Sequence, residues 1–246
     1  KFSDRNAFVK IFGNHDLYWD NDPLAPMVLK SIYGKALKAS AGAVLRAELP
    51  YGYIDIFCTH GHQGDAQSDG NVFSKWFVSY IWGPIQSFLE IRINMPSGNT
   101  TLKNLHNLYM YEWSASQENV ILITGHTHQP VFNSLTHLER LYLELEDAQE
   151  KKDEALIKKI LNEIPRRSRE YDHLSHSFRK MKASYFNSGC CCYADGNITG
   201  IEISDGYMRL VKWSKVEGKP TRIVAEEIHL VELSKKQLRE EVRGKR

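Results

Sequence analysis

The chain carries almost no excess of charge of either sign. Its 246 residues include 32 Lys and Arg against 30 Asp and Glu, a formal net charge of +2. Proteins that bind nucleic acid or an anionic surface through their overall field carry a far larger basic excess. We therefore expect no nucleic-acid partner. A local basic cluster occurs between residues 166 and 182, and a solvated surface explains it better than phosphate binding.

Cysteine is scarce and unevenly placed. The four cysteines are Cys58 and the consecutive Cys190, Cys191 and Cys192. Neighbouring residues of a strand point to opposite faces, so the run is a poor disulfide framework. It also lacks the spaced pairs of a structural zinc site. We interpret the cysteines as small apolar core residues in a reducing compartment, which predicts a cytoplasmic protein.

The chain also lacks an uninterrupted apolar run long enough to cross a bilayer. Residues 72–93 come nearest, but Lys75 and the Gly83-Pro84 break interrupt them. This segment packs as a buried helix pair or presents an apolar surface to a lipid or partner at a membrane periphery, and burial is favoured. No methionine stands at position 1 and no signal peptide is visible. We expect the natural protein to be longer at its N-terminus.

Three apolar segments are each followed by a loop that carries glycine and histidine. The segment 6–13 precedes Asn-His-Asp, the segment 51–59 ends at His60, and the segment 120–124 precedes Gly-His-Thr-His. In open α/β sheets, ligands bind beyond the carboxyl ends of the strands. We therefore predict one common site at these three loops.

The loops contain residue types that bind transition metals. The candidates are Asn14, His15, Asp16, His60, His62, His126 and His128. Imidazole suits Zn, Mn or Fe, and amide or carboxylate oxygens suit harder ions, so a mixed set is typical of a hydrolase metal centre. Glycine beside each ligand lets the backbone turn sharply and approach a bound phosphate.

The remaining pattern predicts a single domain over 1–246 with helical excursions. A helix is expected at 21–37, and two amphipathic helices should form a hairpin within 135–164. Alternating apolar and polar residues predict strands at 42–49 and 51–60. Short strands follow the hairpin, the last of them at 221–233, with turns at Asp195-Gly196 and Asp205-Gly206. We predict a mixed α/β (α+β) protein with helical insertions at about 72–118 and 135–180.

The motifs Gly-Asn-His-Asp (13–16), His-Gly-His (60–62) and Gly-His-Thr-His (125–128), in this order, resemble those of the calcineurin-like metallophosphoesterases. The segment Tyr-Phe-Asn-Ser-Gly (185–189) is similar to the strand that usually follows them. The resemblance implies a sandwich of two mixed β-sheets flanked by helices, with two divalent metal ions at the strand ends. It implies Mn, Fe or Zn as the metals and a phosphate ester as the substrate.

The resemblance also implies a role for each metal ligand. Asn14, His60 and His126 would bind the second metal, and His128 would bind the first metal. The family pattern includes an Asp-x-His and a Gly-Asp-x-x-Asp motif upstream, which supply the other ligands of the first metal. Neither motif occurs before residue 13, so we expect the first two strands to be missing from this chain.

His15 resembles the catalytic histidine that contacts the phosphate and protonates the leaving oxygen, with Asp16 orienting it. His62 is either a residue that supports the site or contacts substrate phosphate, or an ordinary surface histidine. The function implied is hydrolysis of a phosphomonoester or phosphodiester, with a lipid- or nucleotide-linked phosphate as substrate. The alternative is a catalytically inactive scaffold of the same fold that serves protein assembly. The oligomeric state is left open.

Overall fold

A computed structural model describes residues 7–14, 22–34, 37–62, 100–167 and 181–244. The chain divides into two compact units, the first over 1–45 and 56–95 and the second over 46–55 and 96–246. The aromatic segment 72–93 lies outside the described residues.

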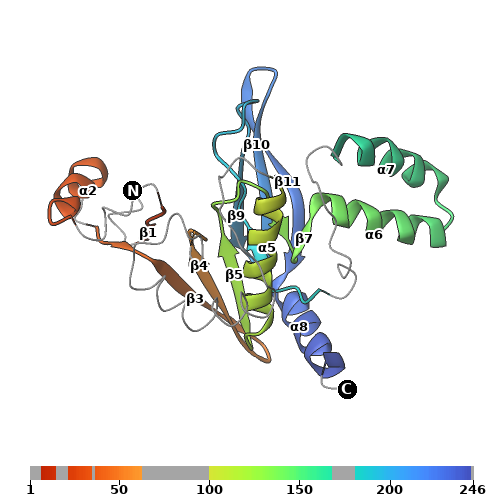
Figure 1. The fold of residues 1–246 in the computed structure, drawn as a ribbon, viewed down its shortest axis with the longest axis horizontal. Coiled ribbons are helices and arrows are strands. Elements are labelled where there is room, and N and C mark those ends of the chain that lie inside the picture. Colours follow the sequence, from red (N-terminus) through yellow and green to blue (C-terminus); the bar gives the residue numbers. More distant parts are fainter. Residues whose placement is uncertain (1–6, 15–21, 35–36, 63–99, 168–180, 245–246) are drawn as a thin grey trace. The chain divides into compact units, whose positions relative to one another are not determined.

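The first unit contains a small parallel sheet packed against one helix. Strand β1 (Lys10–Ile11) pairs with β2 (Ala39–Ser40), and α2 spans Ala25–Tyr33 (Figure 1). Phe12, Leu29 and Ala39 form the local core. The helix is shorter than the expected 21–37. A turn in which Asp22 accepts a hydrogen bond from the Leu24 amide precedes it, and it ends at Gly34, whose φ of 75° lies in the left-handed region. The expected buried strand over 6–13 is likewise reduced to two residues.

Two adjacent strands are shared between the units. Strand β3 (Gly42–Leu49) and strand β4 (Gly52–Thr59) confirm the two strands expected from the alternating pattern. Their connected ends, residues 46–55, belong to the second unit. There Arg46 donates two hydrogen bonds of 2.7 Å to the Asp55 carboxylate, which joins the two strands across the pair.

These two strands belong to a mixed six-stranded sheet in the order β3-β4-β5-β8-β6-β7, whose other four strands lie in the second unit. Its remaining strands are β5 (Val120–Thr124), β6 (Val131–Phe132), β7 (Leu135–Thr136) and β8 (Tyr185–Asn187). The β5 and β8 strands are parallel, whereas β6 runs antiparallel to both β7 and β8. The helix α5 (Thr100–Ala115) packs on β5 and β8.

A separate antiparallel sheet follows, in the order β11-β10-β9. It consists of β9 (Ile198–Ser204), β10 (Tyr207–Val216) and β11 (Lys219–His229). The expected Asp205-Gly206 turn joins β9 to β10, with positive φ at both residues. The prediction of a mixed α/β protein is confirmed. The described residues form three sheets, one of them parallel and one antiparallel, rather than two mixed sheets.

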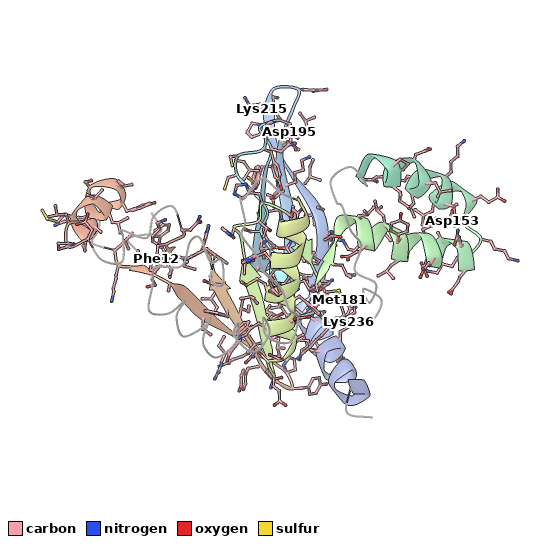
Figure 2. The ribbon with its side chains drawn as sticks, in the orientation of Figure 1. Phe12, Asp153, Met181, Asp195, Lys215 and Lys236 are labelled. Atoms are coloured by element: carbon pink, nitrogen blue, oxygen red, sulfur yellow. The ribbon has the colours of Figure 1, made fainter. Side chains whose placement is uncertain are left out.

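The predicted helical hairpin is present. Helix α6 (His137–Glu150) and helix α7 (Glu154–Arg167) pack through Leu141, Ala148 and Ile160. Asp153, labelled at the turn in Figure 2, accepts a hydrogen bond of 3.0 Å from the Leu156 amide. This contact caps α7 at its first turn.

The C-terminal segment differs from the expected strand. Helix α8 (Leu230–Gly244) begins where β11 ends. Leu230, Leu233 and Gln237 are buried, a helical spacing. The Gln237 side-chain amide donates to the backbone oxygens of Val120 and Ala183, so α8 is fixed to the second unit. Among the described residues, no helix is long and apolar enough to cross a membrane.

A partly buried ion pair joins the hairpin to the antiparallel sheet. Arg140 of α6 contacts Glu226 of β11. Burial raises the pKa of Glu226 from 4.5 to about 7, because its effect is larger than the lowering effect of the Arg140 charge. The negative charge of Glu144 raises this pKa further. The folded pKa lies above the unfolded one, so this carboxyl favours the fold below about pH 4.5 and loses that contribution as the pH rises through about 7.

We therefore expect the free energy of unfolding to fall between pH 5 and pH 8, and Glu226→Gln to flatten that dependence. Urea unfolding at the two pH values measures the difference. Glu227→Gln is the matched control, because Glu227 lies next in the strand and is half exposed beside Arg209. Equal pH dependence in the wild type and Glu226→Gln would contradict this prediction.

Candidate metal centre

The first unit brings two of the predicted ligands together. Asn14 Oδ1 lies 3.1 Å from His60 Nε2, although 46 residues separate them in the sequence. Asn14 follows β1 and His60 follows β4. Two ligand atoms at 90–110° around an ion about 2.1 Å away lie about 3.0–3.4 Å apart. The pair therefore fits two neighbouring positions in the coordination shell of one divalent metal.

Gly13 determines how closely His60 can approach this loop. A Cβ atom at Gly13 would lie 2.8 Å from three atoms of the His60 ring. Real Cβ contacts are not that short, so any side chain here displaces the imidazole. The glycine of the Gly-Asn-His-Asp motif is required by this contact.

The neighbouring histidine is not on the surface. His62 is 1% exposed, and its ring lies 5.4 Å from the His60 ring and 6.5 Å from the Phe12 ring. The surface alternative for His62 is therefore wrong. Its contact with substrate phosphate stays a prediction, and its packing against His60 matches a residue that supports a ligand. His15 and Asp16 lie outside the described residues.

The second unit holds the other two predicted ligands in an unusual backbone conformation. His126 has a φ of 65° and His128 a φ of 61°, both in the left-handed region. This region costs a non-glycine residue of order 1 kcal/mol and is enriched at functional sites. The two pairs of ligands belong to different units.

A buried network of side-chain hydrogen bonds holds the Gly-His-Thr-His loop in place. The Asn187 amide nitrogen lies 2.6 Å from the Gly125 oxygen and 3.1 Å from each of the hydroxyls of Thr124 and Thr127, and its two hydrogens are shared among these three acceptors. Asn107 Oδ1 accepts from the Thr127 hydroxyl at 3.0 Å. The loop is therefore held on both sides of His126.

Tyr185 completes this network. Its hydroxyl donates to Asn107 Oδ1 at 2.8 Å and contacts the Thr124 hydroxyl at 3.0 Å. Burial raises the pKa of Tyr185 to about 12, so the hydroxyl remains a neutral donor. The Tyr-Phe-Asn-Ser-Gly segment thus contributes two side chains, Tyr185 and Asn187, that position the loop.

Sequence reasoning missed the contribution of α5. His106 lies edge-on to His126, with ring centroids 5.2 Å apart, and Asn107 follows it. Both are buried. The other candidates were found because they stand beside a glycine after an apolar segment. His106 and Asn107 lie within a helix and have no such neighbours, so no local pattern could have assigned them to the site.

The cysteine run also differs from the prediction. Cys190 is buried, but Cys191 and Cys192 are exposed, so the interpretation as core residues is wrong for these two. Cys190 follows β8 closely, after Ser188 and Gly189, and the chain then turns outward. Cys190 Sγ lies 3.1 Å from Cys192 Sγ, and this contact with a second thiol raises the pKa of Cys192. His128 reaches the same place from its loop.

One member of the basic cluster is not a surface residue. Lys182 is 7% exposed, and its ammonium donates to the backbone oxygens of Ala115 and Gln117. A cation at this position stabilises the C-terminal end of α5. The solvated-surface interpretation is wrong for Lys182. The other basic residues of the cluster lie at or beyond the end of α7, and nothing in the described part of the chain tests their role.

No family model matches the chain, and no curated protein matches it. Among solved structures, a Vps29 single mutant from Entamoeba histolytica is similar at 13% identity, with 83% of this chain and 79% of that chain covered and a TM-score of 0.26. A TM-score this low carries no weight for fold or function.

Proposed function

We propose that the protein is a metal-dependent phosphoesterase, which hydrolyses a phosphomonoester or phosphodiester. The observation that carries the proposal is the 3.1 Å contact between Asn14 Oδ1 and His60 Nε2. The resemblance pairs these two residues as ligands of one metal, and nothing local in the sequence requires them to meet. The close approach of Gly13 to His60 supports the same assignment.

By the resemblance, Asn14, His60 and His126 would hold one divalent ion and His128 would contribute to a second. Of these ligands, Asn14 and His60 lie together within the first unit. Two divalent ions, when bound, orient a phosphate ester and supply an activated water at neutral pH. The residues of this chain would bind the ions and position them. Asn14 contributes a neutral oxygen and the histidines contribute neutral nitrogens, so a bound phosphate meets no carboxylate from this set.

His15 would contact the phosphate and donate a proton to the leaving oxygen, with Asp16 orienting its ring. An imidazole with an ordinary pKa near 6.5 can deliver a proton close to neutral pH. These two roles come from the resemblance alone. A lipid- or nucleotide-linked phosphate remains the proposed substrate class.

The proposal is tested with the whole protein, a chromogenic phosphodiester and added manganese. We expect turnover that chelation abolishes, and a loss of at least about a hundredfold in His60→Ala and His126→Gly, because even residues that only support a ligand cost 10- to 100-fold. Glycine is chosen at position 126 because it accepts the left-handed backbone, so the fold is spared.

His229→Gln is the matched control, since His229 lies in β11 outside all three motifs. It should retain wild-type turnover. Turnover that survives both His60→Ala and His126→Gly would refute the site. A full-length protein that binds two metals and hydrolyses no phosphate ester would instead favour the assembly scaffold.

A further inference from the structure

We propose that His128, Cys190 and Cys192 form a zinc site with two thiolates and one imidazole. Their ligand atoms all lie within 4.8 Å of one another, in the second unit. The site goes beyond the phosphoesterase centre, whose implied ligands contain no sulfur. It also departs from the spaced cysteine pairs that a structural zinc motif would show, because its third ligand comes from a distant loop.

The two sulfur ligands and one nitrogen ligand favour particular metals. Thiolate sulfur favours Zn²⁺ and other soft ions over Mn²⁺ or Mg²⁺, and imidazole is compatible with Zn²⁺. Around a tetrahedral zinc with Zn–S distances of about 2.3 Å, neighbouring ligand atoms lie about 3.5–3.8 Å apart. The two sulfurs, at 3.1 Å, need to separate by about 0.6–0.7 Å, and any pair of ligand atoms near the 4.8 Å limit needs to approach by about 1 Å. Three protein ligands leave the fourth position to solvent, and His128 and Cys192 are exposed.

The segment that carries the thiols is held in place by the backbone around it. The Cys190 amide donates to the Thr199 hydroxyl at 2.9 Å, and the Thr199 amide donates to the Cys190 oxygen at 2.9 Å. The Cys192 amide donates to Cys190 Sγ at 3.2 Å.

Two further contacts connect the cysteine segment to the His128 loop. The Tyr193 hydroxyl donates to the His128 backbone oxygen at 3.1 Å. Gly189 has a φ of 81°, and a Cβ there would lie 2.1 Å from the Thr199 hydroxyl oxygen and 2.8 Å from Pro130. Only glycine permits this approach, so the fold itself brings the thiols to the histidine.

The assignment changes how His128 is understood. The resemblance assigns it to the first metal of the phosphoesterase centre, whereas the structure places it beside two thiols. A given ring nitrogen binds one ion at a time. The zinc site does not depend on hydrolysis, and either proposal can fail without the other.

The test is cobalt binding by the whole protein after reduction and removal of metal. Thiolate ligands give Co²⁺ a charge-transfer absorption that nitrogen and oxygen ligands do not give, so cobalt in the phosphoesterase centre does not contribute. We expect this absorption to saturate at one ion per chain and to disappear when Zn²⁺ is added. Cys192→Ser, at an exposed position, should lower it by about half, in proportion to the thiolates retained.

Cys191→Ser is the matched control, because Cys191 is the exposed neighbour outside the trio, and it should leave the absorption unchanged. His128→Gly should weaken cobalt binding while both thiols remain. The proposal is overturned if the reduced wild type shows no thiolate absorption, as it would if Cys190 and Cys192 persist as a disulfide. It is equally overturned if Cys191→Ser lowers the absorption as much as Cys192→Ser does.

Discussion

Gly13→Ala is expected to reduce metal-dependent turnover by about a hundredfold while leaving the fold largely intact. The new Cβ would lie 2.8 Å from the His60 ring, so the imidazole must rotate away. A side chain can move at small cost, but this movement breaks the approach of His60 to Asn14. Displacing a catalytic group by about 1 Å costs of order a hundredfold in rate.

The measurement is kcat/KM together with the thermal unfolding midpoint of the full-length protein. Gly200→Ala is the matched control, because a Cβ at Gly200 meets nothing within 4 Å and its φ is ordinary. The control should leave both quantities unchanged. If Gly13→Ala keeps wild-type kcat/KM, the His60 ring is not a ligand in the position described, and the first half of the site fails.

Asn187→Asp is expected to destabilise the second unit by about 3 kcal/mol, because a buried donor is replaced by a carboxylate among acceptors. The lost nitrogen now serves the Gly125 oxygen and the hydroxyls of Thr124 and Thr127. For a chain of this size the effect corresponds to a fall in the unfolding midpoint of roughly 10 °C. The aspartate should recover part of the loss at low pH, where it becomes protonated.

Chemical unfolding measures this effect directly. Asn119→Asp provides the comparison, since Asn119 is exposed and aspartate tolerates its left-handed backbone. We expect a change within about 0.5 kcal/mol there. Equal stability of the two variants would mean that the Asn187 network does not support the Gly-His-Thr-His loop.

Local patterns predicted much of the fold. The alternation at 42–49 and 52–59, the apolar run at 120–124 and the paired amphipathic helices after 135 all correspond to observed elements. The Asp-Gly turn at 205–206 was also predictable, since both residues accept positive φ. Each of these signals is contained within a short stretch of the chain.

Elements determined by distant contacts were not predictable. The segment after His229 continues the β pattern in sequence, yet it is a helix, and Gln237 fixes it to the backbone of Val120 and Ala183. Lys182 looked like part of a basic surface, but it is buried at the end of α5. In both cases the partner lies far away in the sequence.

In the candidate site too, some features were predictable from short motifs and others depend on distant contacts. The motifs indicated Asn14 and His60, and the structure places them together. They gave no indication that Asn107 supports the loop of His126, or that Cys190 and Cys192 lie beside His128. Those relations arise from the pairing of β5 with β8 and from the packing of α5, which no short motif encodes.

The most direct test of the proposed metal centre is the metal content of the whole protein and of its Asn14→Ala, His60→Ala double variant, measured by elemental mass spectrometry. Both proteins carry serine in place of Cys190 and Cys192, so that the thiols contribute no metal. We expect close to two Mn, Fe or Zn ions per chain, with at least one lost in the double variant. Metal content that is below one ion per chain, or that Asn14→Ala and His60→Ala together leave unchanged, would contradict the phosphoesterase centre.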